Sequence, residues 1–150
     1  CPAPAAARPR YAASLVAGAS QFDLSGTGTT ALLGIRVEAE LRRWLVVEGA
    51  LGTFRPEEQF GRRARYVVPE AQLQLQIPGR VVRPYLGAGG GYVFAGGGWQ
   101  TTGTVSGAAG LRVGLPGGRV DARGELRARG IGRSFSGSTA EWTAGLAYRF

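Results

Sequence analysis

The sequence predicts an all-β protein, a single antiparallel barrel of eight strands with up-and-down topology, and three observations lead to this prediction. Eight segments alternate between apolar and polar residues with the period of two that is typical of β-strands. Short stretches, most of them rich in Gly, Pro or Ser, separate these segments and leave room only for turns and loops. The chain has 150 residues, the size of one domain, and eight strands are enough to close a sheet that has no free edge.

The first four strands are expected at residues 11–22, 30–41, 44–54 and 65–77. In the second strand Leu33 and Ile35 lie on one face, and Arg36 and Glu38 lie on the other. The fourth strand is the most regular, because its apolar residues alternate with Glu70 and three glutamines. Such a polar face needs water or polar partners along its whole length.

The last four strands are expected at residues 81–94, 99–113, 119–131 and 139–150. The seventh strand places Val120 and Ala122 opposite Asp121 and Arg123. The connections after strands one, three, five and seven are expected to be long, and those after strands two, four and six are expected to be tight turns. Residues 1–9, rich in Pro and Ala, form a tether before a barrel that spans residues 10–150.

Composition excludes several classes of protein. The net charge is +8, but all 18 basic residues are arginines that are spread singly along strand-like segments, without any helical or zinc-finger motif for nucleic acid. No apolar run is long enough for a membrane helix, although alternating strands would hide their apolar half from such a search. The chain has no His and its single Cys is residue 1, so Ser-His-Asp chemistry and zinc sites are excluded, and we expect neither a metal nor a cofactor.

The polar faces of the strands carry nearly balanced charge, with seven acids and eight arginines. The expected charge network consists of Arg36, Glu38, Glu40, Glu48, Glu70, Arg83, Arg112, Asp121, Arg123, Glu125, Arg127 and Glu141. Arg119, Arg129 and Arg149 lie on the same face. A nearly neutral face suits a closed, charge-paired interior. A pair such as Glu38 and Glu40 is better explained by ion pairing with arginines than by acid and base catalysis, and we expect a protein that is not an enzyme.

The apolar faces then point outwards. They carry Trp99, Trp142, Tyr148 and Phe150 near strand ends, as the aromatic girdles of a membrane barrel require. The sequence therefore predicts a transmembrane β-barrel with a polar, charge-paired interior. A soluble barrel of the lipocalin type, with an apolar lumen and a polar outside, is the alternative.

Two motifs resemble small outer-membrane barrels. The chain ends in a strand with Thr143, Gly145, Tyr148 and Phe150, which resembles the C-terminal signal that the barrel-assembly machinery recognises. The stretch Pro-Tyr-Leu-Gly-Ala-Gly-Gly-Gly-Tyr at residues 84–92 is similar to a strand of barrels related to OmpA and OmpX. The resemblance implies a place in the bacterial outer membrane, and the expected loop lengths put both termini on the periplasmic side.

The N-terminal Cys1 resembles the processed end of a bacterial lipoprotein, which would carry a covalent acyl lipid. Arginines at the expected turns and loops suit the phosphate groups of outer-membrane lipids: Arg8, Arg10, Arg42, Arg43 and Arg80 on the periplasmic side, and Arg55, Arg62, Arg63, Arg65 and Arg133 outside.

Two roles stay open for such a barrel. One is a structural or accessory role, with docking to another membrane protein or to a second copy through a flank of small outward residues. This flank consists of Gly103, Gly107, Ala109, Ala122, Gly124 and Ala128, whereas the outward residues of strands two and four are bulky. The other is a small channel, although long side chains are expected to fill the interior of an eight-stranded barrel.

Overall fold

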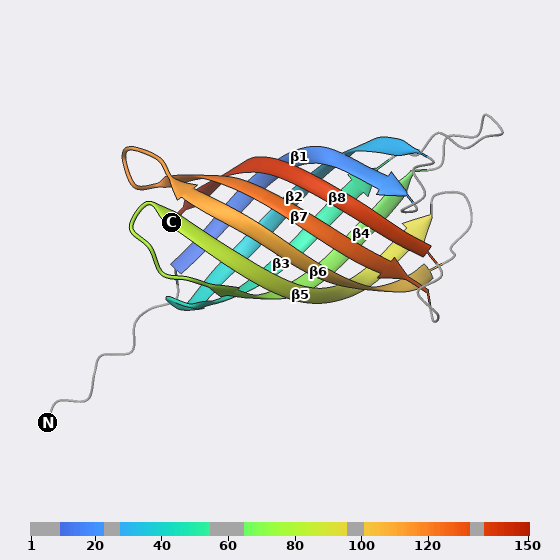
Figure 1. The fold of residues 1–150 in the computed structure, drawn as a ribbon, viewed down its shortest axis with the longest axis horizontal. Helices are drawn as coiled ribbons and strands as arrows, with labels where there is room; N and C mark the ends of the chain where they lie inside the picture. Colours follow the sequence, from blue (N-terminus) through green and yellow to red (C-terminus); the bar gives the residue numbers. More distant parts are fainter. Residues whose placement is uncertain (1–9, 23–27, 55–64, 96–100, 133–136) are drawn as a thin grey trace, which may run out of the picture.

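The computed structural model describes residues 10–22, 28–54, 65–95, 101–132 and 137–150, which form eight β-strands. The strands are β1 Arg10–Phe22, β2 Thr29–Arg42, β3 Leu45–Phe54, β4 Tyr66–Gln76, β5 Val82–Ala95, β6 Thr101–Gly114, β7 Val120–Ile131 and β8 Gly137–Arg149. Each pairs antiparallel with the next, and β8 pairs with β1 to close the barrel (Figure 1). The predicted fold class is confirmed.

The barrel has two different ends. At one end, called the turn end, β1 begins, β8 finishes, and short connections join β2 to β3, β4 to β5 and β6 to β7 (Figure 1). The opposite end, called the loop end, holds the other four connections, most of whose residues lie outside the described ranges. The expected contrast in length is only partly present: connections at the loop end span six, eleven, five and five residues, and those at the turn end span two, five and five.

The strand bounds agree with the expected ones to within a few residues. Trp44 was expected to begin a strand, but it lies with Arg43 in the two-residue turn between β2 and β3. The register between these strands shifts at Glu40 and Arg42, which moves the start of β3 to Leu45. Trp99, which was expected to begin the sixth strand, lies outside the described residues, as does the tether at residues 1–9.

The seam between β1 and β8 requires glycine at two positions. A Cβ atom on Gly18 would overlap the backbone carbonyl of Trp142, and a Cβ atom on Gly145 would overlap that of Leu15. Both strands can therefore approach closely only where a side chain is missing. At the turn end the seam finishes with a hydrogen bond of 3.1 Å from the Phe150 backbone N–H to the Tyr11 carbonyl oxygen.

Alternation along the strands divides the side chains into an interior set and an exterior set. Buried residues are mainly polar or charged, whereas large apolar residues such as Leu15, Leu86 and Leu126 are well exposed. This is the reverse of a soluble barrel, in which the apolar face is buried. Within the described residues, no helix is long and apolar enough to cross a membrane.

Candidate functional site

The centre of the interior is organised around Arg123 on β7. Its guanidinium contacts Glu38 at 2.5 Å, Glu125 at 2.6 Å, and Glu48. Its Nε donates a hydrogen bond of 2.8 Å to the Tyr85 hydroxyl oxygen, and this hydroxyl donates one of 2.6 Å to Glu125. Arg123 therefore joins a carboxylate of its own strand to carboxylates of β2 and β3, which are 85 and 75 residues away in the sequence.

Three further arginines surround this centre. Their positive charges balance the carboxylates that Arg123 alone does not neutralise. Arg112 lies 2.9 Å from Glu38, Arg36 lies 2.9 Å from Glu125, and Arg127 lies 2.8 Å from Glu125. Arg112 also stacks over the Tyr85 ring, with its guanidinium carbon 4.3 Å from the ring centre. Buried charges are tolerated when they are paired and hydrogen-bonded in this way.

Glycine and glutamine residues complete the packing of the centre. The Tyr85 ring lies against Gly110, where a Cβ atom would overlap the phenol group. Gln74 donates a hydrogen bond of 3.0 Å to Glu48, and Arg112 donates one of 3.0 Å to Gln76. Protein groups thus satisfy Gln74 and Gln76 on the polar face of β4, whereas the side-chain nitrogen of Gln72 is buried without a hydrogen-bond partner among the described residues.

Two smaller clusters continue the ion pairs towards both ends. At the turn end Asp121 contacts Arg83 and Arg149. Nearer the loop end Arg129 lies 2.8 Å from Glu70 and 2.9 Å from Glu141. Within the described residues the buried charged side chains are therefore balanced, with acids Glu38, Glu48, Glu70, Asp121, Glu125 and Glu141 and arginines Arg36, Arg83, Arg112, Arg123, Arg127 and Arg129.

Two residues assigned to the charged face lie at its rim instead. Glu40 is half-buried near the turn end and forms no ion pair with the described residues. Arg119 is exposed in the turn before β7, where its guanidinium faces the Tyr148 hydroxyl at 3.5 Å. Alternation gives the correct face for Glu40 but not for Arg119, because Arg119 lies in a turn before the strand begins and contacts the outward-facing Tyr148.

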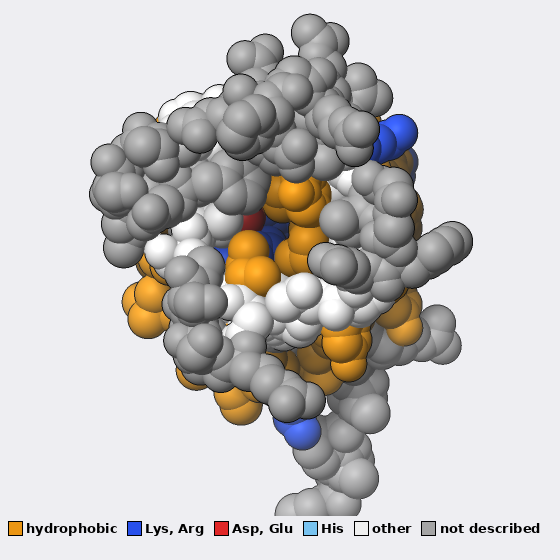
Figure 2. Space-filling model, turned by 90° about the vertical axis from the view of Figure 1, so that its right-hand side faces the viewer, with side chains coloured by type: hydrophobic (Ala, Val, Ile, Leu, Met, Phe, Trp, Pro, Cys, Tyr) orange, Lys and Arg blue, Asp and Glu red, His pale blue; other side chains and the backbone are white. Residues whose placement is uncertain are grey.

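An apolar cluster, which the alternation pattern does not predict, lies inside the barrel near the loop end, where Ser20, Thr30 and Thr139 are also buried. Leu32, Phe54, Val68 and Val93 form a buried cluster, with Tyr66 and Ile131 packed against it. The Phe54 and Tyr66 rings stack with their centres 5.4 Å apart. Viewed from the loop end, apolar side chains line part of the opening and charged groups are visible deeper inside (Figure 2). A void of about 20 Å³ between the two layers has room for about one water molecule.

A signal for this apolar layer is present in the sequence. Towards the loop end, consecutive residues are apolar, as in Leu32-Leu33 and Val67-Val68, so that both faces of the strand are apolar there. Within one strand, however, these runs also fit the simple alternation of a two-sided strand.

The exterior carries an apolar band with aromatic residues towards its edges. Tyr11, Trp44, Tyr148 and Phe150 are exposed at the turn end, and Tyr92 and Trp142 are exposed nearer the loop end. From Trp142 to Phe150 the chain rises roughly 27 Å, which corresponds to about 21 Å along the axis of a barrel whose strands tilt by about 40°. The apolar band of outer-membrane barrels is about 25 Å tall.

The remaining candidate residues lie on the barrel wall. In the small-residue flank, Gly103, Gly107, Ala109, Gly124 and Ala128 are exposed and Ala122 is half-buried. In the C-terminal motif, Thr143 is buried in the interior, Gly145 lies in the seam, and Tyr148 and Phe150 face outwards. Cys1 lies outside the described residues. Among the described residues, no three His, Cys, Asp or Glu side chains are placed to hold a metal ion.

Known proteins resemble this chain in structure. No protein-family model and no curated protein matches the sequence. The Neisserial surface protein A (NspA) superposes with a TM-score of 0.79 at 17% identity, over 93% of this chain and 97% of that one. Ail of Yersinia pestis, solved with the heparin analogue sucrose octasulfate, gives 0.64 at 18% identity, over 95% and 99%. OprG of Pseudomonas aeruginosa, an outer membrane protein, gives 0.63 at 12% identity, over 95% of each chain. The chain therefore has the fold of small outer-membrane β-barrels.

Proposed function

We propose that this protein is an integral barrel of the bacterial outer membrane with a structural or accessory role. The observation that carries the proposal is the combination of a charge-paired interior with a continuous apolar exterior. An exterior of this kind is stable in contact with lipid and not with water. A β-sheet can face lipid only if it is closed, because closure pairs the backbone N–H and C=O groups of every strand. The fold that it shares with NspA, Ail and OprG supports the same location.

Both termini are proposed to lie in the periplasm, because β1 begins and β8 finishes at the turn end. Exposed arginines at that end, namely Arg10, Arg42, Arg43 and Arg80, accompany the aromatic residues and suit the phosphates of outer-membrane lipids. In cells, we expect the protein to fractionate with the outer membrane and to run as a compact species on gels until it is heated. Recovery in a soluble fraction with unchanged mobility would contradict the proposal.

The outer flank of β6 and β7 is the proposed docking surface for another membrane protein or a second copy. A Cβ atom built on Gly103, Gly107 or Gly124 meets nothing within 4 Å, so the surface is open at these three positions. The exposed Val105, Leu111 and Leu126 project between them from the same two strands. Small residues allow a partner backbone to approach closely in lipid.

Leucine substitutions test the docking surface. The double variant Gly107→Leu/Gly124→Leu is expected to remove an association that crosslinking detects in intact membranes. Ala31→Leu on β2, an exposed outward position on another part of the wall, is the matched control and should leave the association intact. An unchanged crosslinked species in the double variant would exclude this flank.

The alternative function, a small channel, predicts ion conduction. Long charged side chains occupy the centre of the interior and the apolar cluster lies between them and the loop end, so we expect no defined conductance steps in planar-bilayer recordings of the purified protein. Reproducible single-channel steps would favour the channel instead.

Biogenesis is proposed to depend on both ends of the chain. Thr143, Gly145, Tyr148 and Phe150 form the proposed signal for the barrel-assembly machinery, so Phe150→Ser should reduce the amount of folded protein in the outer membrane. The proposed acylation of Cys1 would add the mass of acyl groups to the native protein, and intact-mass measurement detects this directly.

A further inference from the structure

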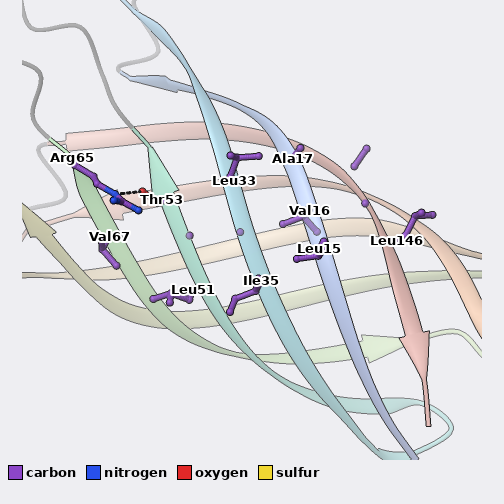
Figure 3. A pocket seen from close by; sticks show the side chains of 14 residues that line it. Leu15, Val16, Ala17, Leu33, Ile35, Leu51, Thr53, Arg65, Val67 and Leu146 are labelled. Atoms are coloured by element: carbon purple, nitrogen blue, oxygen red, sulfur yellow. Dashed lines mark hydrogen bonds between the residues drawn. The ribbon is translucent and has the colours of Figure 1, made fainter.

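Two shallow apolar grooves lie side by side on the exterior of the barrel. The first has a volume of about 680 Å³ and extends over β8, β1, β2, β3 and β4 (Figure 3). Leu33, Ile35 and Leu51 project along it, and Ala17 and Ala144 leave its floor low because their side chains are small. The groove therefore comes from the alternation of bulky and small outward residues.

The second groove has a volume of about 500 Å³ and shares Ile35 and Leu51 with the first. These two side chains form a ridge between the grooves. Ala71 and Gly90 lie on the floor of the second groove, and the exposed Tyr92 lies towards its loop end. The exterior thus has two neighbouring apolar grooves, which are separated by the ridge of Ile35 and Leu51.

A single cationic side chain among the described residues lines the first groove. Arg65, just before β4, is exposed, and its Nε donates a hydrogen bond of 3.3 Å to the Thr53 hydroxyl oxygen (Figure 3). None of the Asp and Glu side chains in the described residues is exposed, so these acids do not neutralise Arg65 on the surface. The loop end of the groove therefore combines a positive charge with a hydroxyl group at the edge of an apolar surface.

We propose that these grooves are a specific binding site for one glycerophospholipid, with its phosphate at Arg65 and Thr53 and one acyl chain in each groove. The inference rests on the proposed function, because it requires the exterior to face lipid. Two grooves with a common wall match a lipid that has two chains, and the guanidinium of Arg65 suits its phosphate, to which arginine donates charge-assisted hydrogen bonds. An arginine near the membrane interface also costs little in a barrel of this kind.

The site is tested by native mass spectrometry of the full chain, refolded in detergent and mixed with phosphatidylglycerol. The wild-type protein is expected to retain one lipid at detergent concentrations that strip the rest. Ala17→Leu and Ala71→Leu, which fill the first and second groove, should each remove it, and Arg65→Gln should weaken retention roughly tenfold. Ala88→Leu, an exposed outward position on β5 outside both grooves, is the matched control and should retain the lipid.

Three results would overturn the site. The first is that Ala71→Leu retains as much phosphatidylglycerol as Ala88→Leu. The second is that the protein retains lipid A in place of phosphatidylglycerol when both are offered. The third is a wild-type dimer that contains no lipid and that Ala71→Leu dissociates. Heat-modifiable gel mobility is measured for each variant to verify a closed barrel. A chain that forms the barrel and enters vesicles but retains no lipid contradicts only the lipid site, whereas a chain that never enters vesicles contradicts the proposed function itself.

Discussion

At the scale of the residue, each charged side chain in the interior needs an oppositely charged partner. Within the described part of the chain, each buried carboxylate contacts at least one guanidinium, and Glu48 and Glu125 each contact three. Burial removes hydration from both partners, so the pairs contribute to stability only while they remain complete. The contribution of one arginine therefore depends on how many acids lose their partner when it is removed.

Arg123 is the strongest case of this dependence. Arg123→Met should lower the free energy of unfolding by about 3–5 kcal/mol, because Glu38, Glu48 and Glu125 lose a shared partner. Urea unfolding in lipid vesicles, followed by tryptophan fluorescence, measures the change. Arg119→Met removes an exposed arginine and should change the same quantity by no more than about 0.5 kcal/mol. Similar losses in the two variants would contradict the assignment of Arg123 as the centre.

Side-chain direction could be predicted from the sequence because alternation fixes the face of each residue. Arg36, Glu48 and Arg127 accordingly lie inside the barrel. Which arginine meets which acid could not be predicted, since contacts across the barrel depend on strand tilt and on the height of each residue along the axis. Arg123 reaches Glu48 over 75 residues of sequence, and periodicity within one strand contains no information about this distance.

At the scale of the element, the sequence predicts the strands. It does not predict how the interior of the barrel divides into a charged centre and an apolar cluster. Each strand has a two-residue period, and the structure confirms all eight. The apolar cluster of Leu32, Phe54 and Val68 arises where inward positions become apolar near the loop end. A continuous apolar run in one strand does not show that its inward residues meet apolar residues of other strands. The register between strands is needed to place these residues in one cluster.

The aromatic pair in this layer joins β3 to β4. Phe54 and Tyr66 are directly opposite each other in the register. A double-mutant cycle with Phe54→Leu and Tyr66→Leu should give a coupling energy of about 0.5–1.5 kcal/mol in unfolding experiments, as expected for stacked aromatic rings. The pair Leu51 and Pro69, which is also opposite but faces outwards, has no stacked rings and should show weaker coupling with Leu51→Ala and Pro69→Ala. Additive effects at Phe54 and Tyr66 would show that the stack contributes little.

The closing seam makes a second prediction at this scale. Gly145→Val would overlap the Leu15 carbonyl and separate β8 from β1, and overpacking of this kind costs about 1–3 kcal/mol or more. The fraction of compact species on unheated gels should fall. In Gly49→Val the added side chain meets open space outside the barrel, and this control should fold like the wild type. An equal fraction of compact species in both variants would mean that β1 and β8 can move apart at Gly145 without a loss of stability.

At the scale of the whole molecule, the charges divide into a compensated interior and an uncompensated rim. The net charge of +8 therefore lies largely in residues at or beyond the ends of the barrel, since the buried acids and arginines are balanced. Composition alone gives only the total, and the closed sheet separates the two populations. The rim can interact with lipid phosphates while the interior stabilises the fold.

This separation predicts a weak response of stability to salt. Raising the ionic strength to about 1 M reduces the Debye length to about 3 Å, but ions do not enter a filled interior. The free energy of unfolding should therefore change by less than about 1 kcal/mol between low and high salt, whereas binding to anionic vesicles should weaken markedly. Titration of both quantities over the same salt series measures the contrast. A large loss of stability at high salt would indicate that the interior is open to solvent.

The pairing of β1 with β8 joins the two strands of the barrel that lie farthest apart in the sequence. A chain that stops before residue 137 lacks β8, and the sheet then has two open edges, on β1 and on β7, instead of none. Such a product displays unpaired backbone groups along two strands and is open to aggregation or to proteases. Only a chain that contains both β1 and β8 can hide both edges, so closure of the barrel distinguishes chains that include β8 from those that stop before it.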